Sequence, residues 1–184
     1  MKSPRIKGSL SSCRRLYDSG VSSHANDPAG SPSANYAELT AQVKALVAAE
    51  KDRVANAANI AALLYDGLPE VNWAGFYFYD GRELVLGPFQ GKPACVRIAL
   101  GKGVCGTAAA SRTTQLIADV HAFDGHIACD ADSRSEVVVP LARNDGTLVG
   151  VLDLDSPRPE RFDAIDQRGL EDIAAVFIAS LEHA

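Results

Sequence analysis

The sequence contains no apolar run long enough to span a bilayer, and no hydrophobic signal core follows its first residues. Its net charge of −5 comes without a basic stripe in the part that is expected to fold. These absences argue against a membrane or a nucleic acid as a partner and favour a cytoplasmic protein. The 184 residues are enough for one domain with a sizeable core.

Cysteine is scarce, with four in the chain and no C-x-x-C pair among them. Without a secretory signal, such cysteines are better suited to catalysis or metal binding than to structural disulfides. Cys95, Cys105 and Cys129 with His126 match a Cys₃His zinc site in composition, but structural zinc usually comes with paired cysteine knuckles. Thiols that cycle between thiol and disulfide are the better interpretation, and small core residues are the plainest alternative. We therefore expect no metal and no cofactor, and Cys13 to lie apart from any site.

Charge and composition divide the chain near residue 33. Residues 1–33 carry five basic and two acidic side chains and end in the turn-forming segment "GVSSHANDPAGSPS". We predict a disordered basic extension over 1–33 and one folded domain over 34–184. A basic, serine-rich opening is also typical of a mitochondrial transit segment, which is the alternative for the location.

The spacing of apolar residues predicts an α+β fold. Helical spacing over residues 35–67, with Ser33 or Asn35 as N-cap, predicts one long helix or two helices in line. Period-two alternation predicts one hairpin over 71–89 that turns at Asp80-Gly81, and a second over 136–156 that turns at 144–146. An amphipathic helix after Asp163 ends the domain. This order favours a central antiparallel sheet with the N- and C-terminal helices packed on one face.

The segment "GKGVCG", residues 101–106, matches G-x-G-x-x-G between a strand and a short helix. Flanking hairpins in place of βαβ crossovers disfavour a dinucleotide site, so the glycines are better explained by a sharp turn near a ligand. The turn places Cys105 at a helix N-terminus, where the helix dipole is expected to lower the pKa of its thiol.

Acidic and aromatic side chains are predicted to line a pocket. Period two places Asp153 and Asp155 on one strand face, and Glu136 on the matching face of its hairpin partner. Those faces also carry valines, which favours a pocket over a solvated surface. Trp73 and Tyr77 share a face and either form aromatic walls or belong to the ordinary core. An acidic pocket with aromatic walls suits a small cation such as the ammonium group of an amino acid.

Four segments in this order resemble the free methionine-(R)-sulfoxide reductase family, which is built on a GAF domain: "NWAGFYFYD", "LVLGPFQGKPACVRIALGKGVCGTAA", "DVHAFDGHIACDADSRSE" and "GVLDLDS". The resemblance runs from about Tyr36 to the C-terminus. It implies a GAF-like sheet with a ligand pocket on the face opposite the helices, free methionine-(R)-sulfoxide as substrate, and a homodimer. It also implies roles for eight residues. These are Cys129 as the nucleophile, Cys95 as the main resolving cysteine with Cys105 able to take part, Glu136, Asp153 and Asp155 as acidic ligands, and Trp73 and Tyr77 as the aromatic wall.

The implied chemistry explains why Cys129 is surrounded by acids. Attack on the sulfoxide sulfur gives a sulfenic acid, Cys95 condenses with it to a disulfide, and a thioredoxin-like dithiol protein reduces that bond. The oxygen leaves only if it is protonated, and three carboxyls in one pocket cannot all stay ionised, so Glu136 or Asp155 is expected to hold a proton. The acids discourage the Cys129 thiolate until a substrate ammonium offsets them. Two alternatives stay open: a GAF sensor that binds a small ligand without turnover, and a zinc-bound structural protein.

Overall fold

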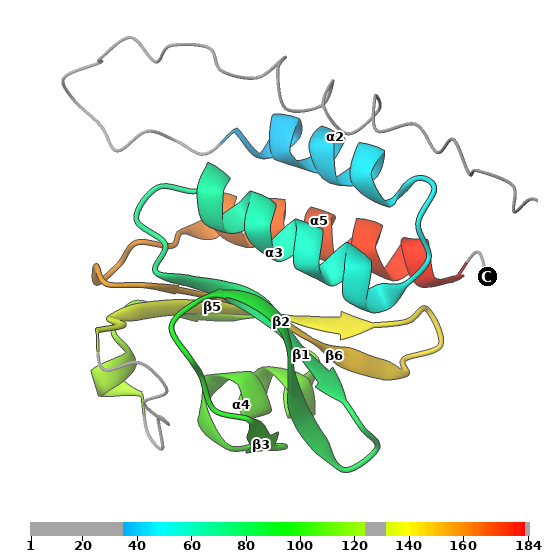
Figure 1. Cartoon of the computed structure of the whole chain (residues 1–184). Helices are drawn as coiled ribbons and strands as arrows, with labels where there is room; N and C mark the ends of the chain where they lie inside the picture. The colour runs from blue at the N-terminus through cyan, green and yellow to red at the C-terminus, as the bar shows by residue number, and fades with distance from the viewer. Residues whose placement is uncertain (1–34, 124–131, 183–184) are drawn as a thin grey trace, which may run out of the picture. The chain divides into compact units, whose positions relative to one another are not determined.

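A computed structural model describes residues 35–123 and 132–182 of the chain (Figure 1). The predicted extension over 1–33, with Cys13, lies outside these residues, as do His126 and Cys129. No helix in the two described ranges is long and apolar enough to cross a membrane. The elements, in chain order, are helices α2 (Tyr36–Val47) and α3 (Arg53–Gly67), strands β1 (Trp73–Tyr79), β2 (Glu83–Gly91) and β3 (Arg97–Ala99), helix α4 (Gly103–Ser111), strand β4 (Gln115–Ile117), the short 3₁₀ helix η1 (Val120–Ala122), strands β5 (Ser135–Ala142) and β6 (Leu148–Ser156), and helix α5 (Ala164–Glu182).

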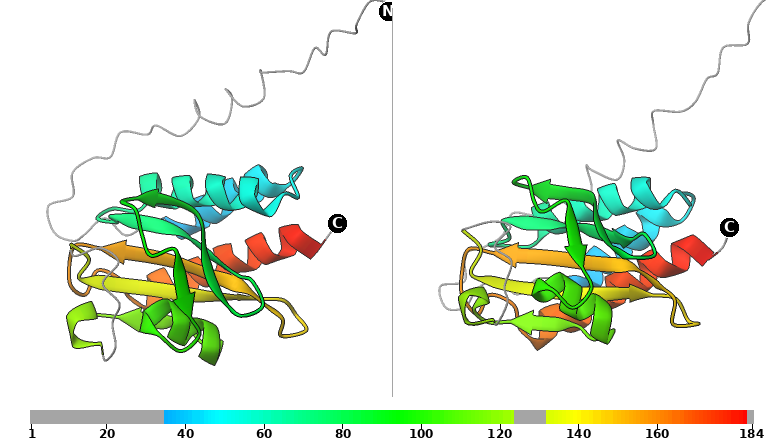
Figure 2. Two further views of the ribbon diagram at one scale, coloured as in Figure 1. Left: turned by 60° about the horizontal axis from the view of Figure 1, so that its bottom comes forward. Right: turned by 90° about the horizontal axis from the view of Figure 1, so that it is seen from below.

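One six-stranded antiparallel sheet organises the domain, with strand order β3-β2-β1-β6-β5-β4. Helices α2, α3 and α5 lie on one side of the sheet, whereas α4 lies on the other side, near β3 (Figures 1 and 2). The predicted α+β class, with the terminal helices packed on one face of an antiparallel sheet, is confirmed.

The N-terminal helical region differs from the prediction of one helix or two in line. Asn35 caps α2 as expected, because its side chain accepts from the backbone N–H of Glu38 at 3.2 Å. The chain then reverses over residues 48–52, and Asp52 caps α3 by accepting from two N–H groups at 2.9 Å each. The two helices lie side by side (Figures 1 and 2). A straight helix over this region would be about 48 Å long, well beyond strands of roughly 30 Å, so the reversal is what lets both helices bury their apolar faces.

Both predicted hairpins are present, and their turns use the residues that the sequence indicated. In the first, the Asp80 carboxylate accepts from the N–H groups of Arg82 and Glu83 at 2.9 and 3.0 Å, and Gly81 has φ +100°. In the second, Gly146 has φ +84°. These left-handed values favour glycine, since a Cβ atom would strain the backbone there.

Alternation along the strands builds two separate cores. On β1, Phe76 and Phe78 point toward the helices, where the ring of Phe76 lies 4.9 Å from that of Phe177 between centroids. Trp73 and Tyr77 point to the opposite side, into a second cluster that includes residues of α4. The sheet therefore has a helix-covered face and a second face on which a site can form.

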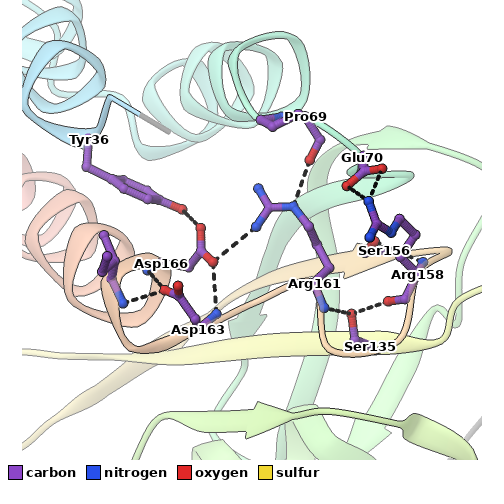
Figure 3. Close-up of polar contacts among 10 residues, drawn as sticks. Tyr36, Pro69, Glu70, Ser135, Ser156, Arg158, Arg161, Asp163 and Asp166 are labelled. Atoms are coloured by element: carbon purple, nitrogen blue, oxygen red, sulfur yellow. Dashed lines mark hydrogen bonds and ion pairs between the residues drawn. The ribbon is translucent and has the colours of Figure 1, made fainter. Parts of the chain in front are cut away.

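A largely buried polar network ties the starts of helices α2 and α5 to the ends of strands β5 and β6 (Figure 3). The Tyr36 hydroxyl donates to Asp166 at 2.8 Å, and the Arg161 guanidinium donates to the same carboxylate at 3.0 Å and to the Pro69 carbonyl at 2.9 Å. The fully buried Ser135 donates to a carbonyl of the segment after β6 at 2.6 Å. The network thus fixes the start of β5 against the end of β6.

Candidate active site

A small cavity opens on the face of the sheet that α2, α3 and α5 leave uncovered. Strands β1, β5 and β6 supply its floor, while the start of α4 and the residues after β2 supply its walls. Six of the eight predicted site residues line it: Trp73, Tyr77, Cys105, Glu136, Asp153 and Asp155. Of the other two, Cys95 is not among the lining residues, and Cys129 lies outside the described residues.

Strand register explains why the carboxyl groups converge. Glu136 on β5 lies opposite Asp155 on β6, and Asp153 lies two residues earlier on β6, between β5 and β1. Because side chains alternate, all three project into the cavity, while the intervening Leu154 and the neighbouring Val137 are fully buried toward the helices.

An aromatic wall flanks the carboxyls. The ring of Trp73 stacks on Tyr77 and on Phe89, with centroids 5.9 and 5.4 Å apart. The indole N–H of Trp73 donates to the Lys92 carbonyl at 3.1 Å, which fixes the ring plane. Gly75 lies between the rings, and a Cβ there would come within 2.6 Å of the Trp73 ring. The missing side chain is therefore what allows this stacking.

Two of the three carboxyl groups are almost dry, with Glu136 7% and Asp153 5% exposed, whereas Asp155 is half-buried. Burial, together with the charges of Asp153 and Asp155, raises the pKa of Glu136 well above its usual range. Burial also raises the pKa of Asp153 to about 7, although hydrogen bonds from Cys105 and Glu136 oppose this shift. Burial and the same acids raise the pKa of Tyr77, which stays a neutral phenol. At neutral pH the cluster therefore holds at least one proton on a carboxyl group.

Cys105 does not have the low pKa that its helix position predicted. Its Sγ lies 3.2 Å from Asp153 Oδ2 and 3.9 Å from Glu136 Oε1, and the residue is 4% exposed. Burial and the two nearby acids raise the pKa of the thiol well above its usual value. The prediction is wrong because desolvation and like charges outweigh the helix dipole, whose effect is modest at the first turn.

The same three residues are the set in the described ranges that could hold a cation. The ligand atoms of Cys105, Glu136 and Asp153 lie within 4.8 Å of one another. Thiolate and carboxylate ligands are types that divalent zinc accepts. This set differs from the Cys₃His alternative, of which it contains Cys105 alone.

The two cysteines within the described ranges are in different redox states. Cys105 is a free thiol, whereas Cys95 is bonded in a disulfide. Cys129, the expected nucleophile, and His126 lie outside the described residues, so their roles stay predictions.

Sequence reasoning missed three polar residues that line the cavity: Lys92, Lys102 and Ser133. Lys102 is exposed at the N-cap of α4, and Lys92 forms an ion pair with Asp132. Ser133 is buried and accepts from the Asn72 amide at 3.3 Å. Neither lysine falls in a periodic segment, so only its place beside a motif glycine, in "GKP" and "GKG", offered a signal.

Comparison with known proteins agrees with this fold. A GAF domain model matches residues 54–179. The chain is 56% identical over 154 residues to protein YtsP of Bacillus subtilis, covering 82% of this chain and 93% of that protein. It is 54% identical over 140 residues to the free methionine-R-sulfoxide reductase of Escherichia coli, covering 76% and 84% respectively. The crystal structure of free methionine-R-sulfoxide reductase from Neisseria meningitidis in complex with its substrate matches with a TM-score of 0.79 and 44% identity, covering 87% of this chain and 96% of that one.

Proposed function

The chain belongs to the free methionine-R-sulfoxide reductase family, a GAF-domain family, and we propose from this premise that it reduces free L-methionine-(R)-S-oxide to L-methionine. The observation that supports this most is the cluster of two buried carboxyl groups, Glu136 and Asp153, with the half-buried Asp155, beside an aromatic wall. A cavity of this kind suits a small cationic or zwitterionic ligand with a polarisable sulfur.

The charges around the cavity are complementary to a free amino acid. Carboxyl groups of Asp153 and Asp155 on the floor suit its ammonium group, and the Lys102 ammonium on the rim suits its carboxylate. The faces of Trp73 and Tyr77 suit the S-methyl end. This arrangement supports the binding of a zwitterion.

A protonated carboxyl supplies the acid that the reaction needs. A sulfoxide oxygen is a poor leaving group unless it receives a proton as the sulfur is attacked. Burial raises the pKa of Glu136 well above its usual range, which favours a protonated carboxyl that can donate to this oxygen. We assign Glu136 as the main acid, with Asp155 as the second candidate, and the remaining acids as ligands of the ammonium group.

The redox cycle follows in three balanced steps. The Cys129 thiol attacks the sulfoxide sulfur, the oxygen passes to Cys129 as a sulfenic acid, and methionine is released. The Cys95 thiol then displaces the sulfenic hydroxyl as water and forms a disulfide with Cys129. A thioredoxin-like dithiol protein reduces this disulfide and becomes oxidised itself. The disulfide of Cys95 is in keeping with a residue that accepts oxidation.

The setting of the reaction is also proposed. The cycle needs a compartment that keeps thiol reductants supplied, which favours the cytoplasm. The family resemblance implies a homodimer, and sedimentation of the full chain measures this directly.

The decisive experiment gives the fully reduced protein one equivalent of methionine-(R)-sulfoxide and maps the disulfide by peptide mass spectrometry. We expect one methionine per chain and a bond between Cys95 and Cys129. Cys129→Ser is expected to abolish methionine release, and Cys13→Ser, outside the proposed site, to keep it. A protein that binds the sulfoxide without releasing methionine, or turns over both epimers equally, would not be this reductase, and the first result would favour a sensor.

A further inference from the structure

Cys105 is hydrogen-bonded to the carboxyl cluster and does not form a disulfide. Helix α4 packs against β5 and β6, which turns the side chain of its third residue toward the cavity floor. Its Sγ lies 3.2 Å from Asp153 Oδ2, within hydrogen-bonding distance for a sulfur donor, and it is a free thiol. Cys105 therefore contacts Asp153 from helix α4, whereas Asp153 itself lies on strand β6.

The direction of this hydrogen bond follows from the protonation state. Burial and the neighbouring acids Asp153, Glu136 and Asp155 raise the pKa of Cys105, so the sulfur carries its proton and donates it. A resolving cysteine must react as a thiolate, which this environment strongly disfavours. The geometry therefore suits a donor better than a redox partner.

Cys105 and Glu136 are both hydrogen-bond partners of Asp153, and Cys105 is the one that comes from outside the sheet. Asp153 lies on the central strand β6, flanked by β1 and β5, and is 5% exposed. Its Oδ2 accepts from Cys105, while its buried Oδ1 has no hydrogen-bond partner among the residues that the structure describes. An oxygen held dry and unpaired at a cavity wall is suited to a ligand donor.

We propose that Cys105 is a positioning residue, whose thiol orients Asp153 so that its second oxygen faces the substrate, and that it takes no part in the redox cycle. This role differs from the second resolving thiol that the family resemblance implies, and it rests on the proposed reductase function. Since no bond to sulfur forms or breaks at Cys105, the residue stays a thiol throughout turnover.

The test compares Cys105→Ser and Cys105→Ala in the full-length protein, assayed with methionine-(R)-sulfoxide and a thioredoxin system. A serine hydroxyl still donates to Asp153, so we expect kcat/KM within about threefold of the wild type. Alanine removes the donor, and we expect KM to rise about tenfold. In the double variant with Asp153→Asn the Cys105→Ala effect is expected to disappear, because the two residues act through one interaction. Ser111→Ala, exposed on the same helix, is the control and is expected to change nothing.

Single-turnover assays separate this proposal from the proposed function. Without reductant, both Cys105 variants are expected to release one methionine per chain and to form the same Cys95 disulfide. If Cys105→Ser were as impaired as Cys105→Ala, or if Cys105→Ala acted equally in the Asp153→Asn background, the positioning role would be wrong. Failure of the wild type to release methionine would instead overturn the proposed function. Thermal unfolding of each variant identifies any loss that comes from misfolding alone.

Discussion

The two faces of the sheet differ although the same strands build both. On β5, Val137 and Val139 point into a core that α3 and α5 cover, and no charged group enters that cluster of described residues. The intervening Glu136 points into the cavity, where burial works against its charged form. Burial thus has opposite consequences a few ångströms apart. On one face it stabilises the fold, and on the other it keeps a carboxyl protonated for chemistry at the expense of stability.

Substitutions of two adjacent residues on β5 test this difference between the two faces most directly. Glu136→Gln keeps the shape of the side chain and removes the acid, so we expect kcat to fall by about 10²- to 10⁴-fold while the free energy of unfolding stays the same or rises. Val137→Ala leaves the cavity untouched and deletes two buried methyl groups, so we expect a loss of about 2 kcal/mol of stability with kcat unchanged. Steady-state kinetics and urea denaturation measure the two effects.

The contrast fails if the two substitutions behave alike. A stability loss in Glu136→Gln comparable to that in Val137→Ala would mean that the carboxyl is structural. Nearly full activity in Glu136→Gln would move the acid to Asp155, where Asp155→Asn is the next variant to measure.

The cavity face also makes stability depend on pH. The pKa of Asp153 is raised from 3.8 to about 7 in the folded protein, so between these values the folded state holds a proton that the unfolded chain has released. The contribution of this group is therefore most favourable at low pH and is lost as the pH rises through 7. We expect Asp153 alone to lower the free energy of unfolding of the ligand-free protein by about 3 kcal/mol between pH 5 and pH 8, and Glu136, whose pKa is raised as well, to add to this fall.

Asp153→Asn is expected to make this slope shallower, because the amide does not titrate, whereas Glu136 keeps part of it. Urea denaturation at pH 5, 6, 7 and 8 measures the effect, with Asp172→Asn, an exposed carboxyl on α5, as the matched control. Salt-bridged acids do not interfere in this range: the pKa of Asp80 is lowered to about 2 by its turn hydrogen bonds, so it acts at lower pH. Parallel curves for wild type and Asp153→Asn would show that Asp153 is not the group responsible.

The local sequence pattern was sufficient to predict the features that depend on periodicity, namely which face of the sheet a strand residue occupies. Alternation fixes the face of each strand residue, which is why Glu136, Asp153 and Asp155 were correctly placed together from spacing alone. Turn chemistry located both hairpins for the same local reason, since Gly81 and Gly146 adopt backbone conformations that few other residues tolerate.

What the sequence did not reveal depends on contacts between distant elements. The reversal at residues 48–52 reflects the size of the sheet that α2 and α3 must cover, which no local pattern encodes. The pKa of Cys105 is set by carboxyls that β5 and β6 bring from 31 and 48 residues away. Local reasoning saw only the helix N-terminus and therefore had the direction of the shift wrong.

The smallest expected effect concerns the rim of the cavity. There the cavity face differs from the helix-covered face because it carries a cation, Lys102, beside its acidic groups. Lys102 lines the cavity and forms no ion pair with the described residues, so its ammonium is available to a substrate carboxylate. Lys102→Met is expected to raise KM for free methionine-(R)-sulfoxide about tenfold, or about 1.4 kcal/mol, with kcat little changed because the interaction is equal in ground and transition states. The corresponding amide lacks the carboxylate, so its KM is expected to be the same for wild type and variant. Lys44→Met, exposed on α2 on the helix-covered side, serves as the control for a lost charge. An equal rise in KM for acid and amide would show that Lys102 shapes the cavity instead of reading the carboxylate, and the rim would then have no part in selecting a free amino acid.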